Sequence, residues 1–268
     1  MALLRVDVPL DLALTTARFR AYGVDLANVW HEGGLRRVVG GREVRIEPAP
    51  GGVDVEPLDA VTEPVVRKML GLEFRLEPFY EWAAEVPELA GLPARLYGFR
   101  PTLAPDPFEM LVGLITAQQV SLFSAGAIRN RLIERFGTPV GIAHAFPTRE
   151  RLAAASEEEL VAVGFTRRKA EYTVGLARSD LDLGSLAALP DDEVKAQLVA
   201  VRGFGEWTAD WFLARHLARP HAWPAGDLVL RKAVRALYGD VDMRPAGDRF
   251  DPFQNLTAHY FLAQHLTP

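Results

Sequence analysis

The spacing of apolar residues changes once along the chain, and this change limits the fold to two kinds of structure in a fixed order. Over residues 1–90 apolar and polar side chains alternate, as they do from Leu35 to Ile46 on either side of Gly40 and Gly41. A period of two predicts strands, and a glycine pair between two such runs predicts a tight hairpin. We therefore expect an antiparallel sheet, with helices over 10–22 and 63–70.

From residue 106 onward the apolar spacing becomes helical. Asp106-Pro107 is typical of a helix start, and Ser121 can cap the next helix. Ser156 and Glu159 form a capping-box pattern, in which each side chain satisfies a backbone N–H of the other. These signals predict a series of short helices.

The two patterns together predict two domains. An α+β domain, an antiparallel sheet with helices, is expected over residues 1–90, and an all-α domain over residues 91–268. The boundary is expected within 87–107, which is rich in Pro and Gly. A chain of 268 residues is long enough to bury two cores.

Composition excludes several classes of protein. The chain has no cysteine, which rules out disulfides, thiolate nucleophiles and cysteine-bound zinc. No apolar run approaches the roughly 20 residues of a membrane span, so we expect a cytoplasmic protein without a membrane partner. The net charge of −5 weighs against nucleic acid, but the acidic excess lies entirely in residues 1–90. Local fields, rather than the overall charge, steer a polyanion.

A glycine pair lies between two helical patterns at Gly203-Phe204-Gly205. Glycine permits a positive φ and lets a phosphate approach the backbone, and the N–H groups at the following helix start favour an anion. On its own such a pair is more often an ordinary helix–helix turn.

Asp227 and two tryptophans follow this turn. Asp227 directly precedes an apolar-basic helix, so it is expected to cap that helix, and a fixed carboxylate could also stabilise a sugar cation or orient a water molecule. Trp207 and Trp211 share one helical face, either as core or as the walls of a slot for a flat ring. Gln118 and Gln119 separate two apolar helices, either as a solvated turn or as a group that replaces an extruded base.

Three motifs carry a family resemblance: LITAQQVS, VRGFGEWTADWFLAR and PAGDLVLRKAV, which begin at Leu114, Val201 and Pro224. This constellation resembles the helix-hairpin-helix DNA glycosylase superfamily, and within it the AlkA type, 3-methyladenine DNA glycosylase II. The motifs cover most of residues 100–265, whereas residues 1–90 match only in architecture. The resemblance implies an enzyme that flips a damaged base out of double-stranded DNA and cleaves its glycosidic bond.

The resemblance also assigns roles to residues. It implies Asp227 as the catalytic aspartate, and Trp207, Trp211 and Leu228 as walls of the base pocket, although an aromatic residue commonly stands at the position of Leu228. The implied DNA contacts are Gln118, Gln119, Gly203, Phe204, Gly205, Trp207 and Thr208, with Gln119 as the wedge. The carbonyls of Val199, Val201 and Phe204 would hold a structural monovalent cation, and no other cofactor is required.

Trp207 stands where bifunctional relatives carry a Schiff-base lysine, so a monofunctional enzyme without lyase activity is implied. Cationic alkylated purines, of the 3-methyladenine and 7-methylguanine type, are the expected substrates, and a monomer is expected. Two alternatives stay open: a glycosylase for deaminated or oxidised purines, and a non-catalytic helix-hairpin-helix DNA-binding module.

Overall fold

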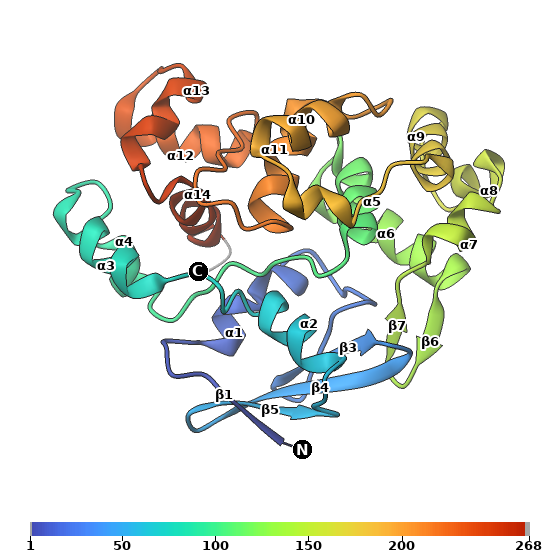
Figure 1. Cartoon of the computed structure of the whole chain (residues 1–268), viewed down its shortest axis with the longest axis horizontal. Helices are drawn as coiled ribbons and strands as arrows, with labels where there is room; N and C mark the ends of the chain where they lie inside the picture. The colour runs from blue at the N-terminus through green and yellow to red at the C-terminus, as the bar shows by residue number, and fades with distance from the viewer. Residues whose placement is uncertain (1, 266–268) are drawn as a thin grey trace.

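The computed structural model describes residues 2–265 and consists of three lobes, each built around its own apolar core (Figure 1). The sheet lobe lies at the bottom of the view, a helical lobe lies above it to the right, and a second helical lobe lies to the left. The predicted order, a sheet with helices followed by a helical domain, is confirmed.

The sheet lobe contains a five-stranded antiparallel sheet in the order β1-β5-β4-β3-β2. Its strands are β1 (Ala2–Arg5), β2 (Val29–His31), β3 (Gly34–Val39), β4 (Arg42–Ala49) and β5 (Gly52–Glu56). The predicted hairpin is confirmed: Val39 pairs with Arg42 around Gly40 and Gly41, which have φ of 56° and 76°. One face of the sheet packs under α2 (Thr62–Met69).

The predicted helix over 10–22 is instead two short pieces, α1 (Leu12–Thr15) and the 3₁₀ helix η1 (Ala17–Phe19). The predicted helix over 63–70 is α2.

The central lobe is helical, as predicted. Its helices are α5 (Pro107–Ala117), α6 (Leu122–Phe136), α7 (Arg149–Ala153), α8 (Glu157–Ala162), α9 (Arg167–Arg178), η2 (Ser185–Ala188), α10 (Asp191–Val199) and α11 (Glu206–Arg215). Asp106 and Ser121 cap α5 and α6 through their side chains, and Ser156 and Glu159 form the predicted capping box.

A small hairpin interrupts the helices, so the expectation of an all-α domain was wrong at this point. Its strands are β6 (Thr138–Val140) and β7 (Ala143–Ala145). The Glu43 carboxylate, on β4, accepts the backbone N–H groups of Ile142 and Ala143 at 2.6 and 3.2 Å. Gly141, at φ 62°, leaves room for that carboxylate, because a Cβ there would lie 2.2 Å from Glu43 Oε2. A contact with the sheet lobe therefore stabilises the hairpin, and local sequence does not show it.

The third lobe combines segments from both ends of the chain. It contains α3 (Leu76–Glu85), α4 (Leu92–Arg95), α12 (Leu228–Tyr238), α13 (Met243–Ala246), η3 (Gly247–Phe250) and α14 (Gln254–Ala263). Phe79 of α3 packs on Tyr260 of α14 with ring centroids 4.7 Å apart. The predicted boundary at residue 90 therefore falls inside this core, because α3 packs with the C-terminal helices. The sequence also predicts a last helix from Asn255 to Leu266, and Leu266 lies outside the described residues.

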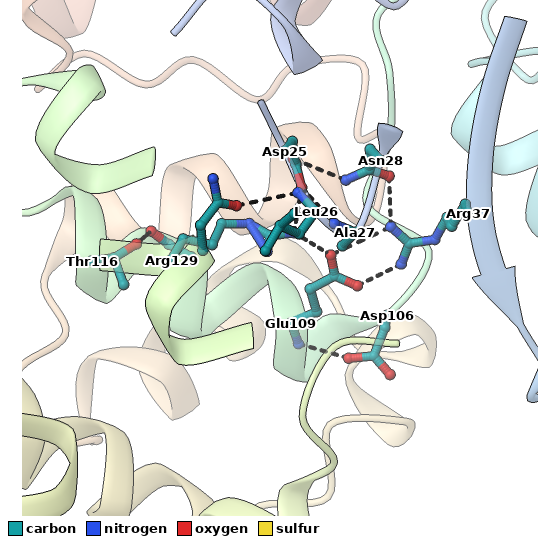
Figure 2. Close-up of polar contacts among 11 residues, drawn as sticks. Asp25, Leu26, Ala27, Asn28, Arg37, Asp106, Glu109, Thr116 and Arg129 are labelled. Atoms are coloured by element: carbon teal, nitrogen blue, oxygen red, sulfur yellow. Dashed lines mark hydrogen bonds and ion pairs between the residues drawn. The ribbon is translucent and has the colours of Figure 1, made fainter. Parts of the chain in front are cut away.

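A buried ion network joins the sheet lobe to the central lobe (Figure 2). Glu109 of α5 binds Arg37 of β3 at 2.5 Å and Arg129 of α6 at 2.6 Å, and Arg37 also donates to Asn28 at 2.7 Å. Burial alone would raise the pKa of Glu109, but the two guanidinium groups outweigh it and lower that pKa. The network fixes the sheet against α5 and α6 and holds Arg129, which also lines the main cavity.

Candidate active site

A cavity of about 540 Å³ lies where the three lobes meet. This volume is within the range of roughly 300–1,000 Å³ typical of small-ligand pockets. Its walls include Arg18 from the sheet lobe, Trp207, Trp211 and Arg215 from α11, and Asp227 and His259 from the third lobe. Residues far apart in the sequence, among them the aspartate and both tryptophans singled out above, are therefore brought together around one space.

Asp227 is held in place by three hydrogen-bond donors. Its Oδ1 accepts the backbone N–H groups of Val229 and Leu230 at 2.9 and 3.0 Å, which confirms the predicted helix cap. Its Oδ2 accepts the indole N–H of Trp211 at 3.3 Å, a contact that the sequence did not predict. Both oxygens are thus fixed at the edge of the cavity, as a charge-stabilising group requires.

Trp211 differs from the expected stacking residue. It is 1% exposed, the guanidinium carbon of Arg215 lies 3.8 Å from its ring centroid, and His259 packs edge-on at 5.7 Å. Because Arg215 already covers a face of the indole, stacking of a flipped base on that face is excluded. Trp211 instead orients Asp227.

Trp207 is better placed to stack on a base. Its side chain is half-buried, lines the cavity and lies against Gly226, where a Cβ would come within 3.3 Å of the indole. It therefore lies beside Asp227. Leu228, by contrast, is 68% exposed and does not line the cavity, so its expected role in the base pocket is not supported.

The glycine hairpin between α10 and α11 has two different glycines. Gly203 has a φ of 90°, and a Cβ there would lie 2.3 Å from the ring of Tyr172. Gly205 is extended at φ −133° as the N-cap of α11, and a Cβ there would meet nothing within 4 Å. Phe204 between them is buried in the central core. The first glycine is required by the fold, and the second leaves an open approach to the backbone.

That open approach leads to unpaired donors. The backbone N–H groups of Gly205, Glu206 and Trp207 have no acceptor among residues 2–265, and they lie at the positive end of the α11 dipole. The carboxylate of Glu206, which would repel an anion, is bound by Arg244 at 2.6 Å. This geometry suits a phosphate.

Thr208 contributes no free backbone N–H to this site. It is 1% exposed, and its N–H donates to the carbonyl of Gly205 at 3.0 Å. The expected DNA contact by Thr208 stays a prediction, and the burial of this residue in the first turn of α11 does not favour it.

The turn between α5 and α6 presents a different set of side chains from those predicted. Gln118 donates its amide to the carbonyl of Gly203 at 3.0 Å and so ties this turn to the hairpin. Gln119 is exposed with φ 55°, a conformation that is rare outside glycine. Leu122 and Phe123, exposed by 44% and 63%, follow at the start of α6, and Leu122 lines the cavity. Two exposed apolar residues directly after the Ser121 cap were a signal the sequence interpretation left unused.

The carbonyl groups expected to hold a cation are partly free. The carbonyl of Val201 accepts the N–H of Phe204 at 3.1 Å, whereas those of Val199 and Phe204 have no donor among the described residues.

Within residues 2–265 no group of three His, Asp or Glu side chains could hold a metal ion, and no helix is long and apolar enough to cross a membrane.

The charged wall of the cavity was not predicted. Burial lowers the pKa of Arg215 well below its usual range, and the nearby Arg18 lowers it further. Burial, followed by Arg215, lowers the pKa of His259 to about 3, so this histidine is neutral near pH 7. Arg215 follows Trp211 by four residues on the same helical face, and this spacing in the sequence could have predicted their contact.

Comparison with known proteins agrees with this architecture. Residues 112–246, just over half of the chain, match the model of the HhH-GPD superfamily of base excision DNA repair proteins. The chain therefore belongs to this superfamily.

Its relatives include the DNA-3-methyladenine glycosylase of Bacillus subtilis, 32% identical over 192 residues that cover 68% of this chain and 63% of the relative. DNA-3-methyladenine glycosylase 2 of Escherichia coli is 32% identical over 65% of this chain and 61% of its own length. The structure of a 3-methyladenine DNA glycosylase from Archaeoglobus fulgidus aligns over 99% of this chain and 98% of that one, with a TM-score of 0.87 and 28% identity. The chain spans less than two thirds of the length of the two curated relatives.

Proposed function

We propose that the protein is a monofunctional DNA glycosylase that hydrolyses the N-glycosidic bond of alkylated purines flipped out of double-stranded DNA. The observation that carries the proposal is Asp227, whose two oxygens are fixed by three donors at the edge of a cavity large enough for a base. The names of the relatives, 3-methyladenine glycosylases, support the alkylated substrate class.

In this proposal the hairpin holds one phosphate on the free N–H groups of Gly205, Glu206 and Trp207. The turn carrying Gln119 enters the space that the flipped nucleotide leaves in the duplex. The flipped base enters the cavity and stacks on Trp207, whose indole attracts a cationic alkylated ring.

Asp227 acts on the sugar. An alkylated purine that is already cationic leaves as a neutral molecule, so it needs little protonation by an acid. As the bond to the base breaks, the carboxylate stabilises the positive charge that develops at C1′ and orients the water molecule that attacks there. One carboxylate is therefore sufficient.

The absence of lyase activity is a separate part of the proposal. It rests on Trp207, which occupies the position of the Schiff-base lysine in bifunctional relatives. Lys232, exposed on α12 at the rim of the cavity, is the amine that the experiment has to exclude. Borohydride should trap no covalent complex between the protein and abasic DNA. If a complex forms, its loss in Lys232→Ala identifies Lys232 as the reacting amine.

A monovalent cation at the carbonyls of Val199, Val201 and Phe204 is a further part of the proposal, supported by the carbonyls of Val199 and Phe204, which have no donor within residues 2–265. Such an ion would add positive charge beside the bound phosphate. A monomer acting on DNA in the cytoplasm completes the proposal.

The decisive experiment uses Asp227→Asn, which keeps a side-chain oxygen for the helix cap but removes the charge. Single-turnover release of 7-methylguanine from duplex DNA should fall by at least about a hundredfold, the size of a lost electrostatic contribution to a transition state. Affinity for the same duplex should be retained. Wild-type excision by the variant would contradict the catalytic role of Asp227, and no base release by the wild type on any lesion would favour a non-catalytic DNA-binding module.

A further inference from the structure

Two guanidinium groups from different lobes converge on one wall of the cavity. Arg18 belongs to η1 of the sheet lobe, and Arg215 is the last residue of α11. Both line the cavity, and Arg18 is close enough to lower the pKa of Arg215. Asp227 and Tyr22 are the groups that oppose this effect at Arg215. The wall is therefore rich in positive charge.

These charges have few partners within the protein. Among residues 2–265 the Arg215 side chain has no hydrogen-bond acceptor, its buried Nε included, and its guanidinium group packs on the face of Trp211. Arg18 donates to the hydroxyl of Thr102 at 3.3 Å, and within the same residues no carboxylate forms a hydrogen bond with it. Asp227 has both oxygens occupied by other donors. Because buried charged donors without acceptors destabilise a fold, this arrangement points to a ligand that supplies acceptors.

We propose that Arg215, supported by Arg18, is the specificity determinant of the cavity: it binds the carbonyl edge of the flipped purine and stabilises the negative charge that the base gains on leaving. This inference rests on the glycosylase function proposed above.

The chemistry of bond cleavage explains the role of the charge. When the bond between C1′ and N9 breaks, its electron pair stays on the base, and the oxygen of a water molecule forms the new bond to C1′ while its proton passes to Asp227 and then to solvent. A cationic base becomes neutral, whereas a neutral base becomes an anion that solvent later protonates. A fixed positive charge beside the base favours both changes, and a neutral base depends on it more because it is the poorer leaving group.

The geometry of hydrogen-bond donors selects the carbonyl edge. A guanidinium group presents only donors, and its preferred partners on a purine are O6 and N7. A 6-amino group places a second donor opposite those donors, which leaves both unpaired. The Arg215 side chain therefore favours 6-oxopurines over 6-aminopurines.

His259 also lines this wall but does not change its electric charge. Its Nδ1 lies 2.9 Å from the carbonyl of Asn255 and must donate to it, so the unprotonated Nε2 has no partner among the described residues. Since its pKa is about 3, it adds no positive charge near pH 7.

The test compares two bases in one duplex sequence: hypoxanthine, a neutral 6-oxopurine, and 3-methyladenine, a cationic 6-aminopurine. Single-turnover release of each is measured for the wild type and for Arg215→Gln. We expect hypoxanthine release to fall by roughly tenfold to a hundredfold, the size of one hydrogen bond to a charged group, while release of 3-methyladenine, which has no carbonyl oxygen at C6, changes little. The ratio of the two rates is the readout, because a general loss of structure does not change it.

Arg231→Gln is the matched control, since Arg231 is an exposed basic residue on α12 that does not line the cavity. It should alter both rates equally. If Arg215→Gln does not fold, Arg18→Gln must lower the same ratio. An equal loss on both bases, or a wild type that releases 3-methyladenine but no hypoxanthine, overturns the inference and leaves the proposed function intact. A wild type that releases neither base overturns the proposed function itself.

Discussion

Replacing each glycine of the hairpin by alanine should separate an effect on folding from an effect on DNA binding, because Gly203 and Gly205 differ in conformation and surroundings. Gly203→Ala places a Cβ 2.3 Å from the ring of Tyr172 and forces an L residue to φ 90°. The backbone alone costs about 1–3 kcal/mol, and the aromatic ring, which is packed and rigid, adds a steric contribution. We expect the free energy of unfolding to fall by at least about 2 kcal/mol.

Gly205→Ala should behave in the opposite way. The position is extended at φ −133° and has open space around its Cβ, so no strain arises. Alanine caps a helix less well than glycine, but it also reduces the entropy of the unfolded chain, and the two effects nearly offset each other. The stability should remain within about 0.5 kcal/mol of the wild type, whereas the added methyl group obstructs the path of a phosphate to the N–H groups.

Urea unfolding and DNA binding measured by fluorescence anisotropy over a series of salt concentrations check both changes. Loss of one phosphate contact should weaken binding and reduce the slope of log K against log salt by about 0.9. The double variant Gly203→Ala with Tyr172→Ala should recover the steric part of the lost stability but not the backbone part. The anion site at the hairpin is refuted if Gly205→Ala binds DNA with wild-type affinity and slope.

Two further predictions concern side-chain contacts. Trp211→Phe removes the indole donor to Asp227, so base release should slow by roughly tenfold with unchanged DNA affinity, and the same substitution should have little effect in an Asp227→Asn background; additive losses would show that Trp211 acts only on packing. Glu109→Gln leaves Arg37 and Arg129 without their carboxylate and should destabilise the fold by about 3–5 kcal/mol in urea unfolding. Because the pKa of Glu109 is lowered in the folded state, its contribution should be present above its ordinary pKa and lost as the pH falls below it; a wild type equally stable across that range would contradict this.

Local signals in the sequence predicted the elements well. The caps at Asp106, Ser121 and Asp227 depend on a side chain and a backbone N–H two or three residues away, so the residues themselves specify them. The same holds for the β3–β4 hairpin, where Gly40 and Gly41 supply the positive φ that the turn requires.

Contacts between lobes were not accessible in the same way. The β6–β7 hairpin depends on Glu43, which precedes it by about a hundred residues, and α3 packs with α14 from the other end of the chain. At the site, the sequence predicted that Asp227 and Trp207 line a common cavity. It also predicted a face of Trp211 free for stacking, whereas Arg215 covers that face in the structure. The meeting of Arg18 with Arg215 depends on how two lobes dock, and no local pattern records that.

The walls of the cavity come from more of the chain than the segment that defines the superfamily. Residues 112–246 contain the hairpin, Trp207 and Asp227, whereas Arg18 and His259 lie outside that segment. The proposed phosphate site and the proposed catalytic aspartate are thus encoded separately from part of the cavity wall. If the proposed function holds, substitutions in the flanking segments change which lesion is accepted while the hydrolytic residues stay the same, so lesion preference can diverge without a change of reaction.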